Sequence, residues 1–488
     1  MKLLTCSFSL IFSLFIFLPC THAQSISDEE LESLISEARD FRKNESYDKA
    51  VLSFEKTLPA YKERENHQEY IKVLSALSQI RSIQSKYKAQ SLYLEKAFAY
   101  GKEHKLLEES WFHEVYTNRA YYYEKTGFFE KAYADLLIAL ELIKKAEEVD
   151  PSALSRQYKA LGRLSAYLGS QRKAGEFYQK SLELNRKTFG ENSDRVAKDY
   201  NVLGVDQEKK GNYVKAIEYQ QASIRIFTRI GKSRHSDIAD SYNNLGNAHF
   251  FLNQLDKALE NYRKAEEIYR NSLGPNALNT AYATMNIGII FAVKGDFETA
   301  LTYFGKEREI KQNLFGGPHP DLIYSYNNLG AAYNRMGDYE KALEMQLKAL
   351  EIAKEVHPPR HPKMAKVYEA TAEASKLLGK TDQALDYYQK SLIAGSLNFE
   401  NQELDSYPET SDYLDPANRL ACYREKAKLL KLKVEKEGAD ASTYFPIAIR
   451  QVFAAIDLLD FMRNSYKSEA SSTHWQRASI DYYELGIE

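Results

Sequence analysis

The chain has 488 residues, with 66 Lys and Arg against 68 Asp and Glu, so its formal net charge at pH 7 is −2. Charges of both signs are mixed along the chain, which argues against a nucleic-acid-binding or membrane-binding surface. Of the three cysteines, Cys6 and Cys20 lie in an N-terminal leader and only Cys422 lies beyond it. An internal disulfide is therefore excluded in the mature chain, and packing has to hold the fold together.

The first 23 residues predict a cleavable signal peptide. Lys2 supplies the positive start, Leu10–Leu18 the apolar stretch and Thr21-His22-Ala23 a small-residue cleavage motif. Lipid anchoring at Cys20 is a minor alternative, because Pro19 directly before it fits that role poorly. No other stretch approaches the ~20 apolar residues of a membrane span. We therefore expect a secreted or periplasmic protein that is not inserted in a membrane after cleavage.

Residues 24–108 carry a degenerate form of a pattern that becomes regular over residues 109–395. In the regular part, seven alanines recur at intervals of 42 residues without a gap. They are Ala132, Ala174, Ala216, Ala258, Ala300, Ala342 and Ala384. Most of them end the phrase Gly-x-aromatic-x-x-Ala. Because Gly or Asn after a helix end can adopt the left-handed conformation of a C-cap, this phrase predicts a helix–turn–helix corner.

A second series marks the helix before each corner. Large residues, mostly tyrosines, also recur every 42 residues, and each is followed four positions later by Gly or Ala, as in Tyr242 and Gly246. A glycine inside a helix costs about 1 kcal/mol relative to alanine. We therefore expect each small residue to make room for a large one from the second helix. Units of this length stack on their neighbours and form a solenoid.

The order Leu245-Gly246…Ala258…Tyr262…Ala265 resembles the tetratricopeptide repeat family. The 42-residue period, with linkers such as Gly317-Pro318-His319-Pro320-Asp321, resembles the repeats of kinesin light chain. The resemblance implies an all-α, right-handed superhelical solenoid. Extended to both sides of the regular part, it implies about ten helix-turn-helix repeats.

The frame breaks after Ala384. Residues 396–417 are rich in Ser, Asp, Asn, Glu and Pro and predict a loop insertion. Residues 418–488 predict one more helical repeat, whose second helix begins at Pro446, and a truncated capping helix that starts near Ser471. Residues 385–488 resemble the stretch that follows the repeats in secreted proteins with a caspase-like CHAT peptidase domain. That domain itself is missing, so the chain would be a truncated form or a fragment.

No catalytic constellation is apparent: the sequence has no Gly-rich phosphate loop, no His-Glu-x-x-His and no nucleophile elbow. Cys422 has only distant histidines such as His474 to pair with, and we interpret it as a small packing residue. His319, His357 and His361 are interpreted as solvated linker residues, since no carboxylate pattern completes a metal site. We expect no enzyme activity, no cofactor and no metal.

Asparagines form a column on the predicted first helices. Asn118, Asn244, Asn286 and Asn328 lie two residues before the small residue, and Asn201, Asn243 and Asn327 lie one residue further back. A side-chain amide both donates and accepts hydrogen bonds. The resemblance implies that the first helices line the concave side and that such amides pair with the backbone of an extended peptide. The alternative is that they bond the backbone of the adjacent repeat and stabilise stacking.

The sequence therefore predicts a protein or peptide partner in this groove. The candidate binding residues are Asn201, Asn243, Asn244, Asn247, Tyr282, Asn286, Tyr324, Asn327, Asn328 and Arg335, with Phe250 and Phe251 beside them. The first interpretation is a non-catalytic interaction scaffold. The alternative is a regulatory or sensor array for a separate effector such as a CHAT peptidase.

Overall fold

The computed structural model describes residues 26–465 except 45, 85 and 234, and no side chains are described for 463–465. The predicted signal peptide, His474 and the capping helix predicted near Ser471 lie outside these residues. In the described part the chain forms helices and no strand. It divides into two units, Met1–Glu191 and Asn192–Glu488.

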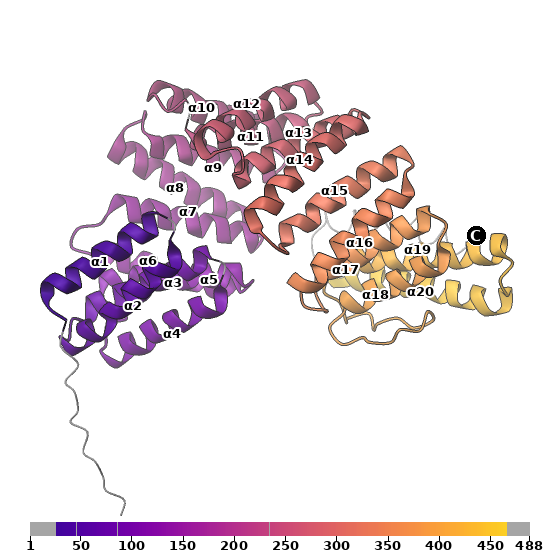
Figure 1. The fold of residues 1–488 in the computed structure, drawn as a ribbon, viewed down its shortest axis with the longest axis horizontal. Coiled ribbons are helices and arrows are strands. Elements are labelled where there is room, and N and C mark those ends of the chain that lie inside the picture. Colours follow the sequence, from indigo (N-terminus) through magenta and orange to yellow (C-terminus); the bar gives the residue numbers. More distant parts are fainter. Residues whose placement is uncertain (1–25, 45, 85, 234, 466–488) are drawn as a thin grey trace, which may run out of the picture. The chain divides into compact units, whose positions relative to one another are not determined.

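Among its described residues, the first unit contains eight α-helices, which Figure 1 labels, and one short 3-10 helix. They are α1 (Asp28–Lys43), α2 (Tyr47–Glu63), α3 (His67–Ile83), α4 (Tyr87–Glu103), η1 (Ser110–Phe112), α5 (His113–Lys125), α6 (Phe129–Lys145), α7 (Pro151–Tyr167) and α8 (Gln171–Phe189).

The second unit contains twelve α-helices among its described residues. They are α9 (Asp194–Lys209), α10 (Tyr213–Arg229), α11 (Ser236–Phe251), α12 (Leu255–Leu273), α13 (Leu278–Val293), α14 (Phe297–Phe315), α15 (Pro320–Met336), α16 (Tyr339–Val356), α17 (Pro362–Leu377), α18 (Thr381–Ala394), α19 (Pro416–Glu437) and α20 (Ala441–Ser465).

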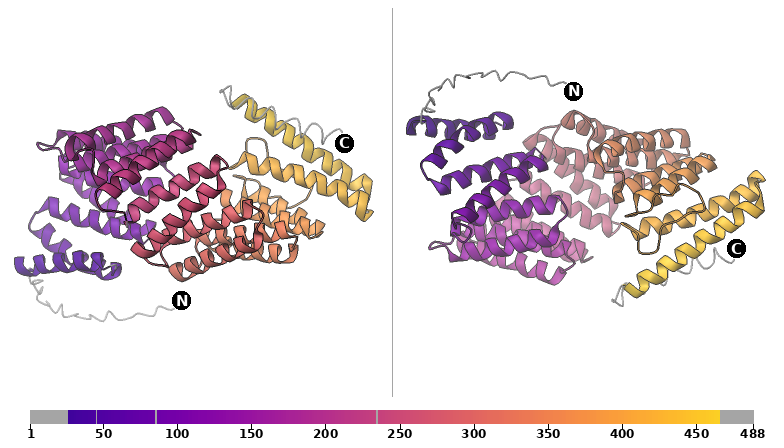
Figure 2. Two further views of the ribbon diagram at one scale, coloured as in Figure 1. Left: turned by 90° about the horizontal axis from the view of Figure 1, so that it is seen from above. Right: turned by 90° about the horizontal axis from the view of Figure 1, so that it is seen from below.

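Each odd-numbered helix packs most closely on the even-numbered helix that follows it, and these are called the first and second helices of a pair below. The last pair, α19 and α20, lies side by side in both views of Figure 2. The described residues thus form ten consecutive helix pairs, which confirms the predicted number of repeats.

The corners and the packing columns follow the sequence pattern. Gly127, for example, has a φ of +85°, and Asn253, which replaces glycine at one corner, has a φ of +57°. The seven periodic alanines are all at most 1% exposed. A Cβ added to Gly288 would lie 2.7 Å from the Phe304 ring of the second helix. The small residues of the first helices therefore do make room for large ones.

Two predicted boundaries near the C-terminus were wrong. Helix α19 begins at Pro416, inside the predicted loop 396–417, because the Asp415 side chain caps its first turn by accepting the Asn418 N–H at 3.2 Å. Helix α20 begins at Ala441, five residues before Pro446. The Asp440 carboxylate caps it by accepting the Ser442 N–H at 3.0 Å. Pro446 is tolerated because it removes only one helical hydrogen bond, close to the helix start.

The segment between α18 and α19 has no regular secondary structure, yet buried side chains fasten it. The fully buried Lys426 ammonium donates to the Leu404 carbonyl at 3.0 Å and to the Gln389 side chain. The Arg419 guanidinium donates to the Glu409 carbonyl at 2.9 Å. One carboxylate, Asp412, accepts three successive backbone N–H groups, those of residues 397–399.

Lys426 gives this region an expected pH dependence. Burial lowers the pKa of its ammonium from 10.5 to about 7, and nearby Cys422 and Asp405 oppose the shift. Between about pH 7 and pH 10 the unfolded chain then binds a proton that the folded chain lacks, so stability should rise with pH in this window. We expect Lys426→Met to flatten that rise in the denaturation midpoint, and the exposed Lys436→Met to leave it unchanged. An equal pH slope in both variants would contradict the assignment.

Candidate functional site

All ten candidate binding residues lie on first helices of the second unit. Asn201 is on α9; Asn243, Asn244 and Asn247 on α11; Tyr282 and Asn286 on α13; and Tyr324, Asn327, Asn328 and Arg335 on α15. The asparagines are half-buried, whereas Tyr282 and Tyr324 are 37% and 48% exposed and Arg335 is exposed. The surface that these ten side chains form is called the first-helix face.

Several of the asparagines bind each other across neighbouring repeats. The Asn286 amide donates to the Asn243 carbonyl oxygen at 2.9 Å, and the Asn244 amide donates to that of Asn201 at 3.3 Å. The acceptor in each case lies 43 residues earlier in the chain. In the first unit, Asn118 likewise donates to the Ser75 hydroxyl, 43 residues earlier, at 2.6 Å. These asparagines therefore stabilise stacking, although through side chains and not through the backbone as the alternative interpretation expected.

Asn247 and the two phenylalanines are also engaged within the fold. The Asn247 side chain accepts the Tyr262 hydroxyl of the second helix α12 at 2.8 Å. Phe251 is 54% exposed, but its ring stacks on Tyr213 of the preceding pair with 5.1 Å between centroids. Phe250 contacts Phe251 edge to face. These residues can contribute only the remaining surface of their side chains to a partner.

The hydrogen bonds between asparagines 43 residues apart form a ladder along the first helices, and helix α15 departs from this ladder. The residue 43 positions before Asn328 is Met285, whose thioether is a weak acceptor. No hydrogen bond joins the Asn328 side chain to another described residue. The side-chain oxygen of Asn327 is buried and accepts no hydrogen bond from the described residues, and that of Asn334 behaves in the same way. Such a buried group costs about 1–3 kcal/mol while it stays unpaired. Asn328 is half-buried and has no atom among these buried unpaired groups, so its amide remains accessible to a ligand.

A buried ion pair fixes Tyr282 on this face. Tyr282 donates its hydroxyl to the Asp321 carboxylate at 2.6 Å, and the Lys311 ammonium lies 4.8 Å from the centroid of its ring. Lys311 forms an ion pair with Glu307 at 2.6 Å, with the two side chains 1% and 0% exposed. Burial raises the pKa of the Tyr282 hydroxyl, so it stays protonated at neutral pH.

The sequence interpretation missed this ion pair. The signal was available, because the residues one repeat before Glu307 and Lys311 are Ala265 and Tyr269. At the positions equivalent to Glu307 the other repeats have small residues, and at those equivalent to Lys311 they have uncharged ones. A carboxylate and a lysine four positions apart at these two places indicate a local polar core. Ser325 on α15 completes it by donating to Glu307 at 2.9 Å.

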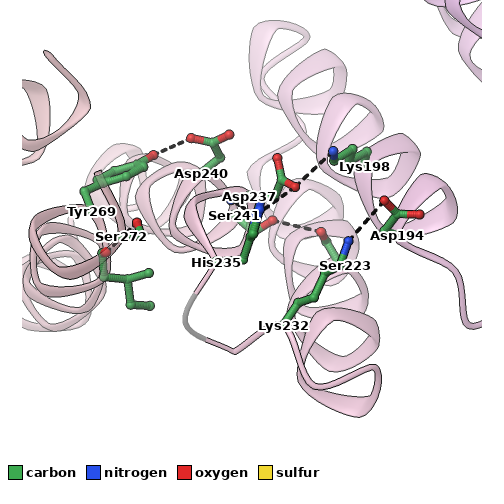
Figure 3. A network of polar contacts seen from close by, with 11 residues as sticks. Asp194, Lys198, Ser223, Lys232, His235, Asp237, Asp240, Ser241, Tyr269 and Ser272 are labelled. Carbon is green, nitrogen blue, oxygen red and sulfur yellow. Dashed lines mark hydrogen bonds and ion pairs between the residues drawn. The ribbon is translucent and has the colours of Figure 1, made fainter. Parts of the chain in front are cut away.

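One repeat earlier, a second polar network fastens the linker before α11 (Figure 3). The Asp237 carboxylate lies 2.9 Å from the Lys198 ammonium, and Asp194 of α9 pairs with Lys232 of the linker at 3.3 Å. Ser223 and Ser241 are hydrogen-bonded at 2.8 Å, and Tyr269 donates to Asp240. These groups satisfy each other, so we interpret the network as structural.

The histidines and the cysteine have structural roles. His319 and His361 cap the helices that follow them: each accepts, through Nδ1, the N–H two residues on, at 3.2 and 3.1 Å. They are half-buried, and this partial burial lowers the pKa of both imidazoles. Cys422 is buried in an apolar cluster, as predicted. Burial raises the pKa of its thiol to about 12, so a reactive thiolate is absent at neutral pH.

In the described part of the chain, no group of three or more His, Cys, Asp or Glu side chains is placed to hold a metal ion. None of the described helices has the length and apolar character that crossing a membrane requires.

The comparisons with known proteins concern the repeats. A family described as "Tetratricopeptide repeat" matches five overlapping segments: residues 157–229, 194–271, 237–313, 277–355 and 321–392. Among solved structures, BtubC (BKLC) from P. vanneervenii is 21% identical, over 59% of this chain and 94% of that one, with a TM-score of 0.36. No curated protein matches.

Two other solved structures are similar in the same way. A putative kinesin light chain from Podosopora anserina with nearly identical TPR-like repeats is 17% identical, over 40% of this chain and 92% of that one, with a TM-score of 0.37. A repeat protein from Parabacteroides merdae is 19% identical, over 57% and 93% of the two chains, with a TM-score of 0.41.

Proposed function

Residues 157–392 belong to the tetratricopeptide repeat family, and on that premise we propose that the chain is a non-catalytic scaffold that binds a peptide or a partner protein on its first-helix face. Such repeats are generally protein-interaction scaffolds. The fold alone does not assign a partner, so the proposal depends on the side chains of this face.

The unpaired amides of α15 carry the proposal. Asn327 and Asn328 stand at ladder positions, but in contrast to Asn243, Asn244 and Asn286 they have no hydrogen-bond partner among the described residues. The Asn328 amide can pair with a peptide C=O and N–H together, whereas Asn327, whose oxygen is buried, can only donate. We therefore centre the proposed binding site on α15, with Tyr324 and Arg335 on the same helix, and assign the paired asparagines to stacking.

An apolar strip lies on the preceding first helix, α13. Met285, Ile289 and Val293 are spaced four residues apart, so they share one face of the helix. Met285 and Ile289 are half-buried and Val293 is 53% exposed. An extended segment whose backbone pairs with Asn327 and Asn328 would rest an apolar side chain on this strip.

The expected result is that the double variant Asn327→Ala/Asn328→Ala loses the partner that the unmodified mature chain captures from the source cell envelope. The matched control is Asn118→Ala in the first unit, where the same amide is already bonded to Ser75. It should retain the partner. Circular dichroism would verify that both variants are folded. Capture by the double variant at the level of the unmodified chain would place binding elsewhere.

The compartment is part of the proposal. If residues 1–23 are a signal peptide, the mature chain begins at Gln24. N-terminal sequencing of the protein isolated from its native envelope should therefore begin with Gln24-Ser25. A blocked terminus with a lipid attached to Cys20 would instead support the anchored alternative.

The second candidate function is a sensor array for an effector such as a CHAT peptidase. The observation that favours it is the C-terminal part, where the family matches end at residue 392 and a long anchored segment precedes α19 and α20. A CHAT domain encoded next to or after this chain, and co-purifying with it, would favour this function.

A further inference from the structure

Two cavities open along the second helices of the second unit. The larger, of about 710 Å³, is formed by α10, α11, α12 and the linker before α11. The smaller, of about 260 Å³, is formed by α12, α13, α14 and the linker before α13. Neither includes a residue of the first-helix candidate set.

The two cavities are the same feature in successive repeats. All eight residues that line the larger cavity have a counterpart 42 residues later that lines the smaller one. Four of the eight positions also keep their residue type: Lys264, Glu267, Ile268 and Asn271 recur as Lys306, Glu309, Ile310 and Asn313. Their spacing puts them on one face of α12 and of α14, so the repeat itself builds the cavity.

Within each cavity the apolar and polar groups are separated. Ile268 and Ile310 are half-buried and provide an apolar wall, next to the buried Ile238 in the larger cavity. The Glu and Asn side chains are exposed at the rim. Each cavity therefore offers an occupant an apolar wall together with one exposed carboxylate and one exposed amide. The same arrangement occurs in both cavities, one repeat apart.

Most of the positive charges at this surface are engaged. Lys264 pairs with Glu260 at 2.7 Å, and Arg270 pairs with Glu266 at 2.6 Å. The Lys306 ammonium lies 5.4 Å from the centroid of the Tyr303 ring. In contrast, the side chains of Glu267, Asn271, Glu309 and Asn313 have no hydrogen-bond or ion-pair partner among the described residues. Two carboxylates and two amides are thus available, which fits a cationic peptide.

We propose that the two cavities form a second binding surface, which takes an extended peptide segment with two basic side chains. Its Lys or Arg residues pair with Glu267 and Glu309, and its backbone pairs with Asn271 and Asn313. Two helix-to-helix steps of 8–10 Å put the carboxylates at most about 20 Å apart. An extended chain advances about 3.3 Å per residue, so the basic residues are at most about six positions apart.

The test uses fluorescence anisotropy with the mature chain and a labelled synthetic peptide. The peptide carries two lysines about six positions apart, with leucine and serine between them. The controls are the same peptide with glutamates for the lysines and one with adjacent lysines. We expect the spaced-lysine peptide to bind at least about tenfold more tightly than either control, and its affinity to fall as salt is added.

The variants make the assignment specific. Glu267→Gln/Glu309→Gln keeps side-chain size but removes both charges, and should weaken binding of the spaced-lysine peptide about tenfold or more. Glu298→Gln, the same change at an exposed position of α14 outside the cavities, should have no effect. Asn327→Ala/Asn328→Ala should leave this peptide bound, which separates the surface from the first-helix face. Equal binding of the glutamate peptide, unchanged binding by the Glu267/Glu309 double variant, or no binding at all would overturn the proposal.

Discussion

Gly246→Ala is expected to destabilise the chain by about 1–3 kcal/mol, the cost of overpacking a filled core. A Cβ at Gly246 would lie 2.6 Å from the ring of Tyr262, which is itself only 4% exposed and cannot move aside freely. The helix-propensity gain of alanine over glycine, about 1 kcal/mol, only partly offsets this clash.

Gly305→Ala is the matched control, because it is the same chemical change inside helix α14. Nothing lies within 4 Å of the Cβ that it would add. It should therefore stabilise the chain by about 0.5–1 kcal/mol through helix propensity alone. Denaturant titrations followed by circular dichroism would measure both variants. If the two substitutions shifted the unfolding midpoint in the same direction, the first-helix to second-helix packing register would be wrong.

Glu307→Leu is expected to destabilise the second unit by about 3–5 kcal/mol. It leaves the Lys311 ammonium, 1% exposed, without the carboxylate that compensates its charge. The double variant Glu307→Leu/Lys311→Met removes the charge as well and should be close to neutral, or stabilising by about 1–4 kcal/mol. The difference arises because burying a pair of charges contributes little net stability, whereas burying a single charge is costly.

Hydrogen exchange of α13, α14 and α15 would locate the effect of these two variants. Only the single variant should lose protection there. A single variant as stable as the unmodified chain would mean that Lys311 reaches solvent or another carboxylate when Glu307 is absent. A double variant as unstable as the single one would show that the pair is required for folding.

The period of 42 residues determined most of the fold. Alanine and glycine at fixed positions specify where two helices approach, and Gly or Asn at the corner specifies where the chain reverses, because both depend on local sterics. The pairing of Gly288 with Phe304 and the left-handed Asn253 could therefore be predicted. The predicted loop end at residue 417 and the predicted helix start at Pro446 were misplaced, because acidic caps, and not the prolines alone, decide where α19 and α20 start.

The tertiary structure decided what the polar residues do. Asn286 and Asn328 are equivalent in the sequence repeat, but only Asn286 has an asparagine 43 residues earlier, Asn243, to bond with; the residue 43 positions before Asn328 is Met285. Likewise, Glu307 is buried by its neighbours on α15, and Lys426 by the segment that it fastens. The sequence period predicts the contacts that recur in every repeat, which lie within one helix pair and the turn that joins its two helices. Contacts between different repeats depend on which two side chains meet across 40 or so residues, and only the folded chain brings them together.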